Sequence, residues 1–220
     1  MVSFTFDDVP GSAFSEGGAI LEAYGGLGTF YLSLSMLQES PSEAGFTHQQ
    51  METARQRGHE LGGHTYGHID FSRASLAASQ RDLETNWQRF QALCPGLELK
   101  SFSYPFGAQT LGVKKLLASR FSSARGILPG IHYREADLYN LKTVKLYEGQ
   151  LPLPHQLEQI QRAAAGNGWL IFYTHDVRAS YSPHGCSPAY FEQVVKACTE
   201  AGLDILPVSG AVERLRVSQI

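Results

Sequence analysis

Short runs of apolar residues alternate along this chain with longer segments in which apolar residues recur every three or four positions. The runs at residues 2–6 and 169–174 are rich in aromatic and β-branched residues, as is typical of strands buried in a parallel sheet. The same pattern predicts further strands at residues 29–34, 100–104, 121–124, 141–147 and 203–208.

The segments between these runs carry helix signals. Thr47 and Gln50 form a capping box that predicts a helix ending at Gly58, and Ser187 followed by Pro188 predicts the start of another. Helices are also expected at residues 111–119 and 154–165, and at residues 75–93 with a buried stripe of Leu76, Leu83, Trp87 and Phe90.

This alternation of strands and helices favours a parallel α/β architecture, of which a (β/α) barrel is the simplest form. The length of 220 residues fits one such domain, and no internal repeat or low-complexity linker divides the chain. We therefore expect a single domain over residues 1–220.

Charge and cysteine content narrow the classes of partner and compartment. The chain has 18 Lys and Arg against 21 Asp and Glu and no basic run, which argues against a nucleic-acid partner. Three cysteines without a CxxC pair are typical of reduced thiols. No signal peptide precedes residues 2–6, and no apolar run approaches the roughly 20 residues of a membrane helix, so we expect a cytoplasmic location, including the inner face of the membrane. The sequence does not predict an oligomeric state.

Residues with metal-binding and acid–base chemistry stand where several predicted strands end. Asp7 and Asp8 follow the first strand, His64 and His68 are four residues apart, and His175 follows residues 169–174. The carboxyl ends of the strands of a β/α barrel converge on one rim, so we expect these side chains to meet. Two histidines at this spacing with one carboxylate suit a divalent cation such as zinc, with a position left open for water.

Each of these features also has an ordinary explanation. Asp7 and Asp8 fit a pair of solvated turn acids, and His175 fits a histidine satisfied at a strand end. The four-residue spacing predicts that His64 and His68 share one helical turn, with both imidazoles on the same side. In the metal-site interpretation one of the two carboxylates is a ligand, and the other is free to accept a proton.

Four motifs occur in an order that resembles the polysaccharide deacetylase family, also described as the NodB-homology domain or carbohydrate esterase family 4. They are Thr5-Phe6-Asp7-Asp8, His64-Thr65-x-x-His68, Tyr104-Pro105-Phe106-Gly107 and Thr174-His175. The resemblance covers nearly the whole chain. It implies a deformed (β/α) barrel of the glycoside hydrolase/deacetylase type, with about seven parallel strands.

The resemblance also implies a role for each motif. Asp8, His64 and His68 correspond to the ligands of zinc or a similar divalent ion, such as cobalt or nickel. Asp7 corresponds to the general base and His175 to the general acid. Thr65 corresponds to the hydroxyl residue that steadies the histidine turn. In the third motif, the backbone N–H of Phe106 is expected to help bind the oxyanion, next to Tyr104.

Two departures from the family pattern concern the base. The family usually has Asp-Asp-Gly-Pro, whereas Val9 stands here in place of the glycine. Because valine disfavours a positive φ, we expect this turn to differ slightly in shape. An arginine that orients the base commonly stands where this chain has Ser103. Arg125 or Lys142 is expected to supply that cation from a neighbouring strand.

A third departure concerns the acid. The Asp-x-x-Asp-Trp segment that usually tunes the acid histidine is absent, and Asp137 or Asp176 is a candidate substitute. The following loop, residues 176–187, contains His184 with other polar residues. This composition suits recognition of a sugar or phosphate as well as it suits an ordinary surface loop.

The sequence therefore favours a metal-dependent deacetylase that removes an N-acyl group, most simply acetyl, from a saccharide. The expected substrate is an N-acylated sugar, a nucleotide-sugar or a lipid-linked saccharide used in surface-polysaccharide biosynthesis. One alternative is a deformylase or small-molecule amide hydrolase of the same fold. Another is a non-catalytic carbohydrate-binding protein.

Overall fold

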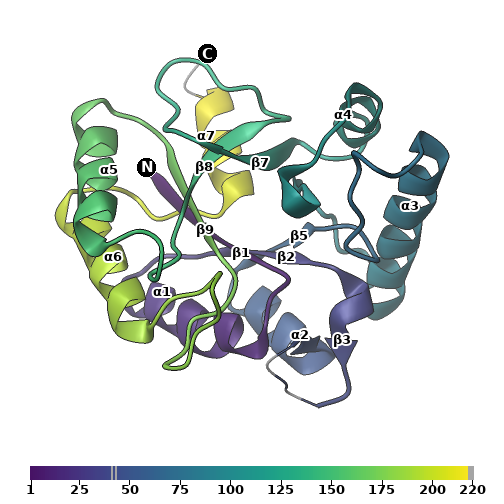
Figure 1. The fold of residues 1–220 in the computed structure, drawn as a ribbon, viewed down its shortest axis with the longest axis horizontal. Helices are drawn as coiled ribbons and strands as arrows, with labels where there is room; N and C mark the ends of the chain where they lie inside the picture. Colours follow the sequence, from purple (N-terminus) through teal and green to yellow (C-terminus); the bar gives the residue numbers. More distant parts are fainter. Residues whose placement is uncertain (41, 43, 218–220) are drawn as a thin grey trace.

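The computed structural model describes residues 1–40, 42 and 44–217. Its centre is a closed barrel of seven strands in the order β1-β2-β5-β6-β7-β8-β9, in which every neighbouring pair is parallel (Figure 1). The predicted deformed (β/α) barrel is therefore confirmed. The strands are β1 (Val2–Asp7), β2 (Thr29–Leu32), β5 (Glu60–Gly63), β6 (Ser101–Ser103), β7 (Ser123–Pro129), β8 (Leu141–Lys145) and β9 (Leu170–Thr174).

Helices surround the barrel, with α3 and α4 on one side and α5 and α6 on the other (Figure 1). The predicted capping box of Thr47 and Gln50 begins α2, and the Ser187 side chain caps α6. Among the described helices, none is long and apolar enough to cross a membrane. The α-helices are α1 (Ala19–Ala23), α2 (His48–Gln56), α3 (Leu76–Leu93), α4 (Leu111–Ala118), α5 (Leu153–Ala165), α6 (Pro188–Glu200) and α7 (Val208–Val217). The π-helix η1 (Ala13–Gly18) leads directly into α1, and there are two 3-10 turns, η2 (Leu34–Met36) and η3 (Pro105–Gly107). A small separate sheet pairs β3 (Leu37–Gln38) with β4 (Phe46–Thr47).

Successive side chains of β1 point alternately to the surrounding helices and to the interior of the barrel. The rings of Phe4 and Phe6 lie 5.4 and 5.7 Å from the ring of Phe191 on α6, outside the barrel. Each fully buried phenylalanine contributes about 1.5–3 kcal/mol to folding. Thr5 and Asp7 occupy the alternate positions and are buried on the inner face. The strand therefore delivers Asp7 to the interior while its apolar residues hold the helical layer.

Strand β5 was not predicted from the sequence. It contains Gly62 and Gly63, and glycine weakens a strand signal. The structure explains why glycine stands here, because a Cβ on Gly62 would lie 2.5 Å from the ring of Tyr31. The neighbouring side chains occupy the space that other residues would need.

The prediction of a strand at residues 203–208 is wrong. Only Ile205 forms a β-bridge, to Val2, and α7 begins at Val208. The physical reason is that β2 occupies this edge of β1 from Thr5 to Asp7, so residues 204–206 can pair only with Val2 at its start. The helical turns η1 and α1 were also not predicted.

The predicted buried stripe of α3 is only partly correct. Phe90 is fully buried, but Leu76 and Trp87 are 49% and 39% exposed. The helix instead buries Asn86, whose side chain accepts a hydrogen bond from the Leu34 N–H. A polar residue therefore takes part in the packing face, which apolar periodicity cannot reveal.

The connection between β7 and β8 contains no helix, unlike the other crossovers of the barrel. The pairing register of these strands also shifts between Arg125 and Pro129. As a result Ile127 and Leu128, at the end of β7, are 43% and 53% exposed. The barrel wall is open on this side.

Candidate active site

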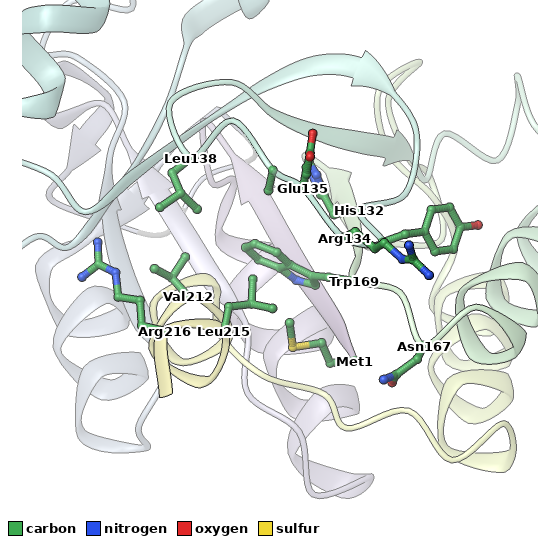
Figure 2. A pocket seen from close by; sticks show the side chains of 12 residues that line it. Met1, His132, Arg134, Glu135, Leu138, Asn167, Trp169, Val212, Leu215 and Arg216 are labelled. Carbon is green, nitrogen blue, oxygen red and sulfur yellow. The ribbon is translucent and has the colours of Figure 1, made fainter. Parts of the chain in front are cut away.

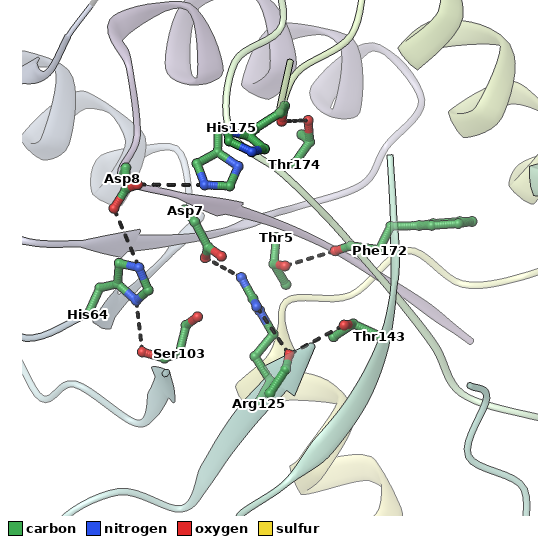
Figure 3. A network of polar contacts seen from close by, with 12 residues as sticks. Thr5, Asp7, Asp8, His64, Ser103, Arg125, Thr143, Phe172, Thr174 and His175 are labelled. Atoms are coloured by element: carbon green, nitrogen blue, oxygen red, sulfur yellow. Dashed lines mark hydrogen bonds and ion pairs between the residues drawn. The ribbon is translucent and has the colours of Figure 1, made fainter. Parts of the chain in front are cut away.

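Residues from several strand ends meet at the carboxyl end of the barrel (Figure 3). Asp7 ends β1 with Asp8 directly after it, His64 follows β5, and His175 follows β9. Arg125 reaches the same space from β7 (Figure 3). The residues that the parallel topology was expected to bring together are therefore neighbours.

Asp8, His64 and His68 form a compact set of potential metal ligands. Each offers one ligand atom, and these atoms lie within 4.8 Å of one another. Asp8 Oδ1 is 3.2 Å from His68 Nε2 and 3.5 Å from His64 Nε2. Two imidazole nitrogens and a carboxylate oxygen are a common catalytic zinc ligand set, which leaves room for water or substrate.

The orientation of His64 is fixed by a backbone carbonyl. Its Nδ1 lies 2.8 Å from the carbonyl oxygen of Ser103, which can only accept, so Nδ1 carries the proton. The Nε2 lone pair then faces Asp8. Burial lowers the pKa of His64 to about 3, so the ring is neutral at physiological pH. A carbonyl partner of this kind is common for metal-binding histidines.

One oxygen of the Asp8 carboxylate, the buried Oδ1, lacks a hydrogen-bond partner within the described residues. Burial, followed by the charge of Asp7, raises the pKa of Asp8 to about 6. Burial also lowers the pKa of His68, so neither imidazole at this oxygen is a charged partner. Converging lone pairs in a buried site are unfavourable unless a cation lies between them, so the donor set fits a divalent metal.

The prediction that His64 and His68 share a helical turn is wrong. Thr65 and His68 have left-handed backbones, with φ of 63° and 52°, in a tight turn after β5. Thr65 Oγ1 accepts a hydrogen bond from the Ile69 N–H, and the Asp82 carboxylate on α3 accepts two further N–H groups of the turn. These bonds occupy donors that a helix would direct to its own carbonyls. The imidazoles still meet, with ring centroids 5.0 Å apart.

Asp7 forms a buried ion pair with Arg125. Arg125, and not Lys142, therefore supplies the cation next to Asp7, and the Lys142 side chain is exposed. The position is equivalent to that of the family arginine, because Arg125 on β7 pairs directly with Ser103 on β6. Burial would raise the pKa of Asp7, but Arg125 and then His64 outweigh it and lower this pKa to about 2.

Two tyrosines hold the Arg125 side chain in place. The guanidinium carbon lies 5.0 Å from the ring centroid of Tyr31 and 5.1 Å from that of Tyr173. Cation–π contacts of this kind contribute about 2 kcal/mol where they are desolvated. The sequence reading missed both rings. Their signal is position, since each lies near the carboxyl end of a barrel strand.

His175 lies opposite the two histidines. Its Nε2 is 3.6 Å from Asp8 Oδ2, and burial lowers its pKa. The Tyr147 hydroxyl is 3.4 Å from His175 Nδ1. When this hydroxyl donates, the ring proton resides on Nε2, facing the carboxylates. Tyr147, just beyond the end of β8, was not predicted to be a site residue.

Asp176 does not contact the His175 ring through any described interaction. Its carboxylate accepts hydrogen bonds from the N–H and hydroxyl of Ser182 and from Arg178, so it organises the loop of residues 176–187. That loop places the His184 ring 5.3 Å from the rings of both His175 and Tyr147. Asp137 forms an exposed ion pair with Lys114. Tyr147 and His184 therefore take the positions next to the histidine where an acidic residue was expected.

The third motif borders the ligand set through Phe106. The Phe106 ring is 61% exposed, and its centroid lies 4.5 Å from that of His68. Tyr104 is buried, and its hydroxyl donates to the carbonyl oxygen of Tyr139. Tyr104 therefore packs inside the protein and holds the turn through this bond, whereas the Phe106 ring is exposed beside His68. The role of the Phe106 N–H in oxyanion binding stays a prediction.

Backbone strain is concentrated at this site. Six described non-glycine residues have a positive φ, and all except Asn167 belong to the motif turns. Such conformations cost about 1–3 kcal/mol each and cluster at functional sites. The five are Asp8, Val9, Thr65, His68 and Phe106, with φ between 40° and 63°.

A separate cavity of about 260 Å³ lies at the opposite, amino end of the barrel (Figure 2). Met1 and Trp169, which precede β1 and β9, line it together with Val212 of α7. None of the Asp, His or Arg residues described above lines it, so it is not part of this site.

Comparisons with known proteins identify the family and the fold of the chain. A family model described as polysaccharide deacetylase matches residues 1–120. Among curated proteins no sequence match is found. Solved structures match over most of the chain at low identity, which shows the fold.

Three of these structures illustrate the range. A CE4 family pseudoenzyme from Bacillus anthracis has a TM-score of 0.69 at 13% identity, with 96% of this chain and 65% of that chain covered. The Bacillus subtilis peptidoglycan deacetylase PdaC has a TM-score of 0.65 at 15% identity, with 100% and 94% covered. The Streptococcus pyogenes deacetylase PplD, solved with acetate, has a TM-score of 0.58 at 21% identity, with 64% and 62% covered. The chain thus spans about two thirds of the pseudoenzyme chain.

Proposed function

The chain belongs to the polysaccharide deacetylase family, and on that premise we propose that it is a metal-dependent hydrolase that removes an N-acyl group, most simply acetyl, from a saccharide. One observation carries the proposal. The ligand atoms of Asp8, His64 and His68 converge within 4.8 Å, and the buried Asp8 Oδ1 among them has no hydrogen-bond partner within the described residues.

A divalent ion held by Asp8, His64 and His68, zinc first and cobalt or nickel as alternatives, would polarise the acyl carbonyl and acidify bound water. Asp7 accepts the proton of the attacking water as general base. Its ion pair with Arg125 keeps the carboxylate ionised and fixes its position. No covalent nucleophile is needed.

His175 protonates the departing amine. This step requires a proton on Nε2, and the Tyr147 hydroxyl at Nδ1 favours that tautomer when it donates. General acids of this kind contribute about 10²–10⁴-fold to the rate. The Phe106 N–H contributes to oxyanion binding, which typically adds a further 10²–10³-fold per donor.

The substrate class follows from the family. The exposed Phe106 ring beside His68 suits contact with an N-acylated sugar unit, and we propose that the sugar is carried as a nucleotide-sugar, a lipid-linked saccharide or another glycan precursor. A deformylase with the same residues is the alternative. The two differ in product, because one releases acetate and the other formate.

The direct test is acetate and formate release from N-acyl sugars by the metal-loaded protein. We expect turnover that falls at least 10²-fold in Asp7→Asn, with metal content unchanged. Asp137→Asn, which alters an exposed carboxylate, is the matched control. Unchanged turnover in Asp7→Asn would disprove the assigned base. Calorimetric sugar binding with no turnover would instead support a non-catalytic carbohydrate-binding protein.

A further inference from the structure

A cavity of about 790 Å³ opens between the end of β7 and helix α5. It exists because no helix separates β7 from β8 and because their register shifts between Arg125 and Pro129. In Figure 1 β7 and β8 lie between α4 and α5, with α7 beside them. Ile127 and Ile131 form an apolar part of its wall, and Lys145 lines it from β8.

This cavity shares a wall with the candidate active site. Tyr173 lines it and also contacts the Arg125 guanidinium, which pairs with Asp7. Lys145 Nζ lies 5.8 Å from the ring centroid of Tyr147, whose hydroxyl reaches His175. A substrate whose acyl group lies at the catalytic residues therefore has a neighbouring space for another substituent.

The charges in the cavity are of one sign. Lys145 and Arg162 line it, and none of its lining residues is acidic. Lys145 Nζ donates to the neutral side chain of Gln150. The Arg162 ion pair with Glu158 is long, at 4.0 Å, and exposed, so it contributes little. The first turn of α5 also has no acidic residue and no side-chain cap, so the positive end of this helix is not neutralised.

Gln159 adds an amide group to the lining of the cavity. Gln159 is 8% exposed and lines the cavity, and no hydrogen bond of its side chain is found within the described residues. The Gln159 amide atoms are not among the fully buried atoms that lack a partner, so they remain accessible, and an amide N–H next to cations is well placed to donate to an anion. Its burial separates it from ordinary surface glutamines.

We propose that this cavity binds a phosphate group attached to the N-acyl sugar substrate, with Lys145 and Arg162 as charge partners and Gln159 as a hydrogen-bond donor. The proposal rests on the proposed function, because it assumes that the acyl sugar occupies the adjoining site. Phosphate is common to nucleotide-sugars and lipid-linked sugars. The apolar wall at Ile127 and Ile131 offers contact to either carrier.

A binding experiment tests the cavity without any assumption about catalysis. Pyrophosphate is titrated calorimetrically into the metal-loaded wild type, Lys145→Met, Arg162→Gln and the control Lys115→Met. Lys115 is an exposed cation on α4, on the other side of the barrel from α5 (Figure 1). We expect Kd to rise about 5- to 10-fold in the first two variants, since Arg162 is partly exposed, and to stay unchanged in the control. No binding of pyrophosphate would overturn the proposal. Equal binding in all four proteins would also overturn it, because the affinity of phosphate bound at the metal would not depend on Lys145 or Arg162.

A kinetic experiment then joins the cavity to the reaction. For N-acetylglucosamine 1-phosphate we expect Lys145→Met and Arg162→Gln to raise KM about 5- to 10-fold with kcat unchanged. For N-acetylglucosamine neither constant should change. Equal effects on both substrates would contradict phosphate recognition. Absence of turnover with both, together with the expected pyrophosphate result, would leave the phosphate site standing and refute the deacetylase proposal.

The two sources of phosphate are separated by UDP and farnesyl diphosphate. Tighter binding of UDP than of pyrophosphate supports a nucleotide carrier, and tighter binding of farnesyl diphosphate supports a lipid carrier. Equal affinity for all three supports recognition of the phosphate alone.

Discussion

Replacing Arg125 by serine tests whether this buried cation on β7 orients Asp7, the role that the family resemblance assigns to an arginine at the position of Ser103 on β6. The Arg125 side chain is fully buried, and its Asp7 partner is 7% exposed. The change leaves Asp7 buried without its cation and empties the space between Tyr31 and Tyr173. Removing one partner of a buried ion pair costs about 3–5 kcal/mol.

Part of this loss depends on pH in a defined direction. The folded pKa of Asp7, about 2, lies below its ordinary value of 3.8. The pair therefore adds stability that is fully present above about pH 4 and is lost as the pH falls through about 2. The shift corresponds to about 2 kcal/mol. The remainder reflects lost packing and does not depend on pH.

Urea unfolding at pH 7, 4 and 2.5 measures both parts. We expect Arg125→Ser to be less stable than the wild type by about 3–5 kcal/mol at pH 7 and by a smaller amount at pH 2.5. Acetate release should fall at least 10²-fold, because the base loses its orientation. Arg125→Lys, which keeps the charge but not the planar group, should lie between the two.

The pairing of Ser103 with Arg125 allows a relocation experiment. The double variant Ser103→Arg/Arg125→Ser places the guanidinium on β6, at the same level of the barrel and beside the space that Arg125 leaves. We expect it to be more stable and more active than Arg125→Ser alone. The reasoning would be refuted if Arg125→Ser were as stable and active as the wild type. It would also be refuted if the double variant lost as much stability and activity as Ser103→Arg and Arg125→Ser lose together.

Three further changes test the ligand set, the acid and the barrel wall. We expect elemental mass spectrometry to find roughly one zinc per chain in the wild type and in the exposed-residue control His48→Ala, and His68→Ala to lose it; retained metal would disprove the ligand set. His175→Ala should lower kcat by about 10²–10⁴-fold while keeping its metal, so a loss of metal would assign this histidine a different role. Gly62→Ala places a Cβ 2.5 Å from the Tyr31 ring, so urea unfolding should show a free energy of unfolding lower by about 1–3 kcal/mol. The control Gly149→Ala has open space around the new Cβ and should have little effect.

The sequence predicts the site better than the elements that carry it. Asp7, Asp8 and His175 follow strands with strong aromatic signals, so the rim where they meet was predictable. Strand β5 was not, because its glycines carry no strand signal and are explained only by the neighbouring Tyr31 ring. The turn that holds His64 depends on Asp82 from a distant helix, which spacing alone cannot show.

The departures from the family pattern show the same division. That a cation faces Asp7 was predicted from the resemblance to the family, in which an arginine orients the base. That Arg125 supplies it depends on the register of β6 and β7, which the sequence does not state. The neighbours of His175 illustrate the opposite case. An acidic residue was expected, but Tyr147 and the His184 ring lie there instead, brought by β8 and by a loop that Asp176 holds.

At Val9 the free-energy cost of a strained backbone opposes the gain from burying the side chain. The residue stands where relatives commonly have glycine, and its φ of 40° is one that a β-branched residue rarely adopts. This strain costs about 1–3 kcal/mol. The side chain is nevertheless fully buried, and its burial contributes about 1.5–3 kcal/mol. The two terms nearly cancel, which explains how the chain keeps valine in this turn.

Comparing Val9→Gly with Val9→Ala separates the two terms, because both variants lose the valine methyl groups and only glycine also relieves the backbone. At an ordinary position glycine is less stable than alanine by about 0.5–1 kcal/mol. At Val9 we expect the order to reverse, with Val9→Gly more stable than Val9→Ala by about 1 kcal/mol in urea unfolding. Both should be less stable than the wild type. If Val9→Ala were the more stable of the two, the turn would carry no strain, and the valine would be held by packing alone.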